Sequence, residues 1–155
     1  MAPEFAGIVA GPKAEVNSFH FIEFNGKDEK MAPKKSKYFH RIKNLPVVML
    51  TEQSKSHMVV GTNVLLSFIE NPPGCVFPLH KHPSEQILII LEGEEDHICG
   101  KEKFLMKAGD ICIHPPNAMH GGESKTGFKG IDIFCPPRED WLAKLKQAIK
   151  KKGKA

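Results

Sequence analysis

From Tyr38 onward, short apolar segments rich in β-branched residues recur between groups of turn residues. Such segments predict strands, which we expect at Pro46–Leu50, Met58–Glu70, Cys75–Leu79, Gln86–Leu91, Asp96–Cys99, Asp110–His114 and Phe128–Cys135. Glycine or proline marks the turns expected at residues 72–74, 92–93, 100, 107–110 and 121–122. Many short strands with this spacing are typical of a sandwich or barrel rather than of alternating strands and helices. The pattern therefore predicts an all-β barrel over residues 38–138.

The two ends of the chain depart from this pattern. Residues 1–37 are interrupted by Pro and Gly, which predicts an N-terminal arm in which Phe19–Phe24 could form an edge strand. After Pro136 and Pro137, apolar residues recur at helical spacing: Trp141, Leu142, Leu145, Ala148 and Ile149. Residues 139–155 therefore predict a C-terminal helix with a Lys-rich tail, its apolar stripe against the barrel wall and its lysines in water.

The formal net charge of +4 is concentrated at the C-terminal end. Residues 139–155 hold six Lys against Glu139 and Asp140, so this end accounts for the whole net charge of the 155 residues. A nucleic-acid binder is expected to carry a basic stripe on its folded body, so we expect no nucleic-acid partner. No segment is long and apolar enough to cross a membrane, and residues 1–11 do not resemble a signal peptide. We therefore expect no membrane contact and a cytoplasmic location.

The segment Gly74–Gln86 and the later His120 carry the candidate chemistry. In an extended strand the side chains alternate between faces, so His80 and His82 point to the same side and Gln86 shares their parity. Two imidazoles two residues apart can hold one ion. His120 follows a Pro-Pro-Asn turn that fixes where it points. These residues predict a single site for a divalent metal ion.

These residues resemble the two motifs of the cupin superfamily. The first motif is matched in every spacing by Gly74, His80, His82, Gln86 and Gly93. The second is matched by Gly109, Pro115 and His120, with Asn117 in place of a glycine and Ser124 in place of an asparagine. Asn tolerates positive φ, so we expect the turn to survive. The resemblance covers roughly residues 58–138 and implies a jelly-roll barrel, a double-stranded β-helix, in which His80, His82, Gln86 and His120 bind the metal.

Glu85 is the alternative to Gln86 as the fourth ligand, since a carboxylate is usually the stronger ligand. Parity favours Gln86, because residue 85 faces away from the interior unless a bulge intervenes. Three neutral imidazoles and an amide leave the ion its whole charge, which makes it a stronger Lewis acid and gives less support to high-valent iron chemistry. Zn, Ni, Mn, Fe and Co all accept such ligands, so the identity of the ion stays open.

The last strand and the turn after it offer residues for a reaction. Asp132 and Phe134 share one strand face, and Arg138 follows the Pro-Pro turn. A carboxylate in an apolar barrel can act as a general base, and a guanidinium can grip a carboxylate substrate. The structural alternative is that Asp132 is a buried partner of Arg138 and that Phe134 belongs to the core.

Together with the histidine motif, this stretch resembles the KdgF-type cupins, which in pectin and alginate breakdown help to open 4,5-unsaturated uronate rings to linear keto sugars. The resemblance implies that Asp132, Phe134 and Arg138 lie on the substrate side and that the substrate is a small anionic molecule. The interior at Leu88 and Ile90 is apolar, however, where a sugar would need polar partners.

Three hypotheses for the function follow. The first is a metal-dependent enzyme that tautomerises, isomerises or eliminates on a small carboxylated sugar or keto acid. The second is an iron-dependent dioxygenase or lyase, and the third is a non-catalytic small-molecule-binding cupin. A homodimer is also expected, because residues 86–91 are apolar on both faces and the outer face must be covered by the arm, the C-terminal helix or another subunit.

The remaining histidines and the cysteines receive structural interpretations. His20, His40 and His57 are expected to be structural or exposed, whereas His97 and His114 lie on barrel strands and His114 could line the cavity. The four cysteines, Cys75, Cys99, Cys112 and Cys135, are isolated in the sequence, which predicts reduced and mostly buried thiols.

Overall fold

The computed structural model describes residues 36–152. Nine strands and one α-helix follow a short 3-10 helix, η2 (Ile42–Asn44). The strands are β1 (Val47–Met49), β2 (Lys55–Val60), β3 (Leu65–Asn71), β4 (Cys75–His80), β5 (Glu85–Cys99), β6 (Glu102–Lys107), β7 (Ile111–His114), β8 (His120–Ser124) and β9 (Phe128–Cys135), and the helix is α1 (Glu139–Lys152). The prediction of an all-β fold with a C-terminal helix is confirmed. The predicted arm lies almost entirely outside the described residues, as does its proposed edge strand at Phe19–Phe24.

Several predicted strand boundaries were wrong. The segment Met58–Glu70 is two strands, because the chain turns between Val60 and Leu65, where the N–H of Gly61 donates to the carbonyl of Val64 (2.8 Å). The turn expected at Glu92 and Gly93 does not form, and β5 runs through it. Strand β6 was missed, since its charged residues conceal the alternation. Gly121 and Gly122 belong to β8 rather than to a turn.

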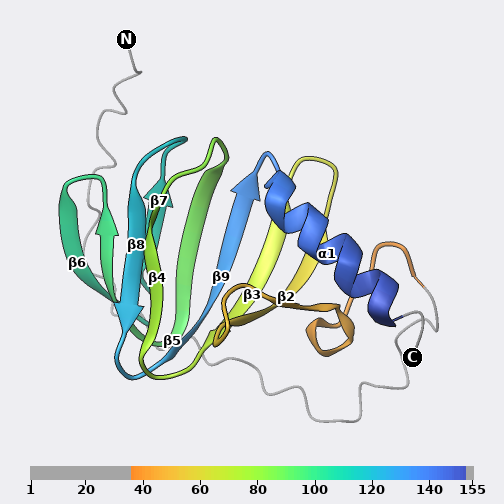
Figure 1. The fold of residues 1–155 in the computed structure, drawn as a ribbon, viewed down its shortest axis with the longest axis horizontal. Helices are drawn as coiled ribbons and strands as arrows, with labels where there is room; N and C mark the ends of the chain where they lie inside the picture. Colours follow the sequence, from red (N-terminus) through yellow and green to blue (C-terminus); the bar gives the residue numbers. More distant parts are fainter. Residues whose placement is uncertain (1–35, 153–155) are drawn as a thin grey trace, which may run out of the picture. The chain divides into compact units, whose positions relative to one another are not determined.

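Two antiparallel sheets share the long strand β5. The first half of β5 pairs with β9 and β7, and β9 continues through β3 and β2 to β1. The second half of β5 pairs with β6 and β8, and β8 pairs with β4. Figure 1 shows the resulting curl, with β4 and β8 on one side of β5 and β9, β3 and β2 on the other. One strand therefore carries side chains into the interior from both sheets.

A bulge marks the point where β5 passes from one sheet to the other. The register against β9 shifts between Ile90 and Glu92, and Gly93 follows with a φ of +79°. A Cβ atom at Gly93 would lie 2.1 Å from the backbone oxygen of Gly127, so the two strands approach here as only glycine allows. This explains why the pair Glu92-Gly93 has the composition of a turn although the strand continues.

The interior between the sheets holds two apolar clusters with a polar layer between them. The first cluster contains Val48, Met58, Leu65, Phe134, Trp141 and Leu145. The second contains Ile69, Leu88, Ile90, Met106, Cys112 and Phe128. Along β9 the inward positions run from Phe128 in one cluster through Asp132 to Phe134 in the other. Buried polar residues such as Asp132 therefore lie between two apolar clusters.

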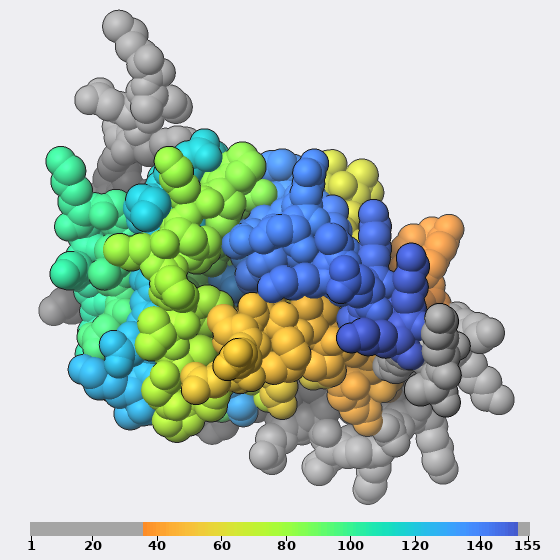
Figure 2. All heavy atoms as spheres, viewed as in Figure 1, coloured from red at the N-terminus to blue at the C-terminus, as the bar shows by residue number. Residues whose placement is uncertain are grey.

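Helix α1 closes the interior at the end of the first cluster. Trp141 and Leu145 pack with Phe134, whose side chain faces inward, and the amine of Lys144 donates to the carbonyl of Leu50 (3.2 Å). In Figure 2 the blue residues of α1 lie against the orange-to-yellow segment that carries β1 and β2. The predicted apolar stripe is confirmed for Trp141, Leu142, Leu145 and Ala148, whereas Ile149 is 53% exposed. The stripe covers the mouth of the interior rather than the outer face of residues 86–91. No helix in the described part of the chain is long and apolar enough to span a membrane.

The four cysteines are free thiols, as predicted. Cys75 and Cys112 are buried and Cys99 is half-buried, but Cys135 is exposed at the end of β9, which the sequence analysis did not anticipate.

The crowding at Gly93 leads to a stability prediction with a matched control. Gly74 has nearly the same conformation (φ +77°), but a Cβ there would meet no atom within 4 Å. We expect Gly74→Ala to lower the free energy of unfolding by about 1–2 kcal/mol, the ordinary cost of a positive φ. Gly93→Ala should lower it by about 1–3 kcal/mol more, because its methyl group meets backbone. Urea denaturation measures both, and equal losses would contradict the assignment of Gly93 as a steric requirement.

Candidate metal centre

The two histidines of the first motif and the one histidine of the second meet at the same point. His80 ends β4 and lies directly opposite His120, the first residue of β8, in the pairing of these strands. His82 follows the end of β4 and is held by the backbone N–H of Asn117, which donates to its carbonyl (2.8 Å). One ligand nitrogen from each of the three rings lies within 4.8 Å of the others. The predicted convergence of His80, His82 and His120 is therefore observed.

The local reason for this convergence differs in part from the expected one. His82 lies beyond the last residue of β4, so strand alternation does not place it beside His80. The turn before His120 does keep its expected shape, because Asn117 adopts a positive φ of 63° where a glycine was expected. The turn of the second motif thus contacts His82 through the backbone N–H of Asn117.

The hydrogen-bond partners of the rings fix which nitrogen carries the hydrogen. Nδ1 of His80 lies 2.9 Å from the carbonyl of Pro78, Nδ1 of His82 lies 2.9 Å from that of Ser84, and Nδ1 of His120 lies 2.8 Å from that of Ala118. A carbonyl only accepts, so each Nδ1 carries a hydrogen and each neutral ring keeps a lone pair at Nε2. This is the arrangement that metal-binding histidines adopt in proteins.

Gln86 completes the arrangement, and Glu85 does not. Oε1 of Gln86 lies 3.0 Å from Nε2 of His82 and 3.1 Å from Nε2 of His120. Gln86 is buried, whereas the side chain of Glu85 is exposed. Several lone pairs thus face one another with no hydrogen between them, which is unfavourable unless a cation or a proton lies among them.

Burial keeps the imidazoles of His82 and His120 neutral. Desolvation lowers the pKa of His120 to about 4 and, with help from the charge of Arg138, lowers the pKa of His82. A proton is therefore a poor occupant of this point at neutral pH. A divalent ion fits the donor set better, since three imidazoles and a carbonyl oxygen suit zinc and its neighbours in the transition series.

Asp132 touches the same carboxamide from its other side. Nε2 of Gln86 donates to Oδ1 of Asp132 (2.7 Å), and Asp132 is 5% exposed. Burial raises the pKa of Asp132 to about 7, although the amide of Gln86 and the charge of Arg138 oppose the shift. A carboxyl with such a pKa can both accept and release a proton near neutrality.

The predicted substrate-side residues do not all face the cavity. Arg138 lines it, and its Nη2 and Nε donate to Asp140 (2.7 and 3.0 Å) rather than to Asp132. The guanidinium also lies over the Trp141 ring (4.7 Å). Phe134 is 0% exposed and packs between His82 (5.6 Å between ring centroids) and Trp141 (4.6 Å). Phe134 therefore supports the site from behind.

Three buried polar residues extend the site inward, and of these the sequence analysis offered only His114, as a residue that could line the cavity. His114, fully buried on β7, stacks on His120 with 4.4 Å between the ring centroids. Its Nε2 lies 2.7 Å from Nε2 of His97, and Nδ1 of His97 lies 2.7 Å from Oε2 of Glu95. Cys112 and His114 point to the same side of their predicted strand, which indicated part of this cluster. No feature of the sequence around Glu95 indicates that its side chain is buried.

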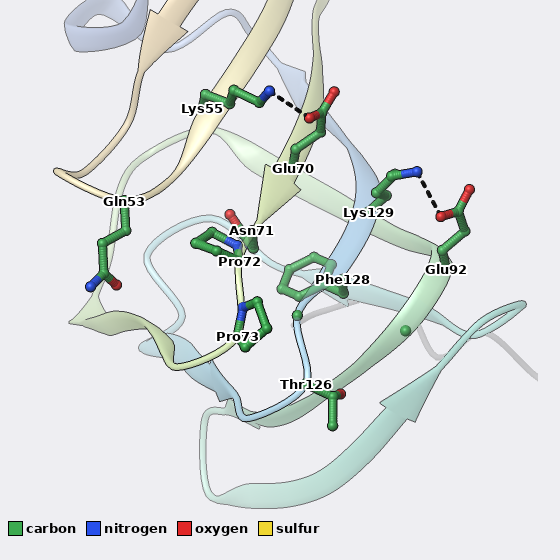
Figure 3. A pocket seen from close by; sticks show the side chains of 12 residues that line it. Gln53, Lys55, Glu70, Asn71, Pro72, Pro73, Glu92, Thr126, Phe128 and Lys129 are labelled. Carbon is green, nitrogen blue, oxygen red and sulfur yellow. Dashed lines mark ion pairs between the residues drawn. The ribbon is translucent and has the colours of Figure 1, made fainter.

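The cavity at this centre is small, and its polar residues share the lining with apolar ones such as Leu88, Phe128 and Trp141. About 40 Å³ is open among His80, Gln86, Glu95, His97, His120, Asp132 and Arg138. A separate surface hollow of about 480 Å³ lies beside Pro72 and Phe128 (Figure 3). There Lys55 pairs with Glu70 (2.8 Å) and Lys129 with Glu92 (2.7 Å), which leaves no charge unbalanced for an ionic ligand. The chemistry therefore concentrates in the small cavity.

Two other histidines follow their expected roles. His40 is exposed, and Nδ1 of half-buried His57 lies 3.4 Å from the carbonyl of Leu45, a structural contact. His20 lies outside the described residues.

Comparison with known proteins bears on the motif region and on the fold. Residues 67–134 match the family model described as the cupin domain. Over 71 residues the chain is 35% identical to the pectin degradation protein KdgF of Dickeya dadantii. This match covers 44% of the chain and spans 64% of the length of that protein.

Solved structures of similar fold include an RmlC-like cupin from Shewanella frigidimarina, with a TM-score of 0.64 and 26% identity over 68% of this chain and 96% of that one. KdgF from Halomonas has a TM-score of 0.62 over 66% of this chain and 96% of its own, and at 23% identity it supports the fold alone.

The neighbours Glu85 and Gln86 provide a direct test of the donor set. We expect Gln86→Ala to weaken the binding of Zn²⁺ or Co²⁺ by about tenfold or more, because it removes the oxygen that faces His82 and His120. Glu85→Ala should leave the affinity unchanged, since that side chain is exposed. Competition with a chromophoric chelator measures both dissociation constants. A larger loss in Glu85→Ala than in Gln86→Ala would refute the assignment.

Proposed function

We propose that this chain, whose residues 67–134 match the cupin domain and which resembles KdgF, is a metal-dependent enzyme that opens the ring of a small 4,5-unsaturated uronate. The observation that supports the proposal most is the position of Gln86. Its carbonyl oxygen faces the imidazoles of the proposed metal ligands, and its amide nitrogen holds Asp132. A proton-transfer group and a metal site are thus joined by one side chain, as metal-assisted tautomerisation requires.

The proposed ligands of the ion are His80, His82, Gln86 and His120. Because these four ligands are all neutral, a bound divalent ion would keep its charge and polarise an oxygen of the substrate. The rest of the chemistry falls to side chains that the structure describes.

We assign the proton transfers to Asp132. Opening the ring takes the proton of the anomeric hydroxyl, breaks the bond between C1 and the ring oxygen and places a proton on that oxygen, which leaves an aldehyde at C1 and an enol at C5. Protonation at C4 and loss of the enol proton then give the ketone. The formula of the sugar is unchanged, so the reaction needs no oxidant and no water. With a pKa of about 7, Asp132 can accept the first proton and return one in the same turnover.

Arg138 is the proposed contact for the substrate carboxylate. Its bonds to Asp140 use Nε and one hydrogen of Nη2, so N–H groups remain for a second acceptor. The cavity of about 40 Å³ is far below the roughly 300 Å³ of ordinary ligand sites. The substrate must therefore displace side chains at the mouth, of which Arg138 is the one with a charge to offer. Phe134 is proposed as a positioning residue that holds His82 in place.

A homodimer is the proposed assembly, because an apolar face of the first sheet has no cover among the described residues. Ile111 and Ile113 are 61% and 58% exposed on β7, and Ile89 and Ile87 lie opposite them on β5. Helix α1, one of the three expected covers, packs on the inward side instead. An exposed apolar patch of this kind usually marks an interface.

Asp132→Asn tests the proposed reaction. Asparagine keeps an oxygen that can accept the amide hydrogen of Gln86, so metal content should not change. We expect kcat on 4,5-unsaturated galacturonate or its epimers to fall about 10²–10⁴-fold, since asparagine moves no proton. The loss of ultraviolet absorbance of the conjugated double bond follows the reaction.

Asp96→Asn is the matched control, because Asp96 is exposed on β5 and pairs with Lys125. Its turnover should equal that of the wild type. Full activity in Asp132→Asn would rule out the proposed role, and no turnover of any unsaturated uronate by the metal-loaded wild type would rule out the substrate.

Light scattering tests the assembly. Ile113→Lys places a charge in the proposed interface and should convert a micromolar dimer to monomer, whereas Val76→Lys, on the other sheet at 51% exposure, should remain dimeric. A wild type that is monomeric at that concentration would show that the patch has another cover.

A further inference from the structure

We propose that His97, Cys112 and His114 form a second metal site, inward of the first, for a borderline-soft transition ion such as Zn²⁺. This site is independent of the proposed uronate reaction. It rests on residues from both sheets that meet across the interior.

The topology brings the three residues together. Cys112 and His114 project inward from β7, and His97 projects inward from the second half of β5 in the opposite sheet. Their ligand atoms all lie within 4.8 Å of one another, and all three residues are buried. Two ligands of one tetrahedral zinc are about 3.3–3.8 Å apart, so small side-chain movements suffice to bind an ion.

The hydrogen bonds of the cluster are incomplete without another occupant. Oε2 of Glu95 is an acceptor, so Nδ1 of His97 carries a hydrogen. In the neutral form of this ring, Nε2 offers a lone pair to Nε2 of His114 (2.7 Å). Nδ1 of His114 has no hydrogen-bond partner in the described part of the chain. If the hydrogen of the His114 ring is on Nε2, the buried lone pair of Nδ1 has no donor. If that hydrogen is on Nδ1, the lone pairs of the two Nε2 atoms of His97 and His114 face each other. An ion between the rings removes the second conflict.

The charges of the cluster favour a divalent ion even with another nearby. The ring of His114 stacks on that of His120, so the two sites are neighbours. The first site offers only neutral ligands. The second offers a thiolate from Cys112 and the carboxylate of Glu95, which holds His97 as carboxylates hold metal-binding histidines. This negative charge offsets the repulsion between two cations.

The thiol of Cys112 supplies selectivity. Burial raises its pKa to about 12, so it is a neutral thiol in the metal-free chain. An incoming ion displaces this proton to solvent and forms a metal–sulfur bond. The side chain of Cys99 interacts with that of Cys112 and is a candidate for the fourth position. Nitrogen and sulfur donors together select zinc-like ions over magnesium or calcium.

Cobalt binding to the full-length, reduced protein tests the site without an assay of activity. The exposed Cys135 is first changed to Ser, so that its thiol cannot contribute. We expect two equivalents of Co²⁺ per chain and an intense thiolate-to-cobalt charge-transfer band that grows with only one of them. Imidazole and amide ligands give no such band.

Matched variants assign the two equivalents. Cys112→Ser should bind one equivalent and show no band, whereas Cys75→Ser, which changes a buried thiol outside the cluster, should bind two and keep the band. His80→Ala should lose the other equivalent and also keep the band, so the failure of one site is distinguishable from that of the other. Circular dichroism verifies that each variant is folded.

X-ray absorption of the parent protein loaded with Zn²⁺ gives a reading that needs no Cys112 variant. We expect a sulfur neighbour for about half of the bound zinc. A single equivalent without the charge-transfer band, a band that persists in Cys112→Ser, or a shell of nitrogen and oxygen alone would overturn the proposal.

Discussion

The carboxamide of Gln86 fixes the arrangement on which the rest of the site depends. Its oxygen must face His82 and His120, because its nitrogen is committed to Asp132. A glutamate in this position would have no hydrogen to offer Asp132 at neutral pH and would place two carboxylates side by side. The amide therefore separates a neutral group of metal-type donors from an acidic group that exchanges protons. That separation requires an amide, although carboxylates are usually the stronger ligands.

The fold maintains this arrangement by enclosing the polar layer between two apolar clusters. Phe134, at the edge of one cluster, touches His82, and Cys112 belongs to both the other cluster and the proposed second site. Removal from water strengthens each hydrogen bond in the layer and makes each unmatched polar atom costly. The same burial lowers the pKa of His120 and raises that of Asp132. Stability of the core and reactivity of the site thus have one origin.

The sequence predicted which side chains converge better than it predicted the strands around them. The spacing of the histidines and of Gln86 within the two motifs identified His80, His82, Gln86 and His120. That spacing reflects local backbone geometry, which a sequence pattern records directly. The boundaries of β5 and β8 were wrong since glycine serves tight strand contact as well as turns, and only the partner strand distinguishes the two. Glu95 was missed for the same reason: its burial depends on the opposite sheet, and charge alone predicts exposure.

The position of Arg138 argues against the ion pair with Asp132 that the sequence left open. An ion pair between these residues would have made Asp132 a structural anion with a lowered pKa. The guanidinium instead bonds to Asp140, two residues along, and only its charge acts on Asp132 from a distance. Desolvation therefore dominates at Asp132, and the carboxyl is left near its titration point. A carboxyl in that condition costs stability, and both its hydrogen bond to Gln86 and the proton transfers proposed for it give a reason to retain it.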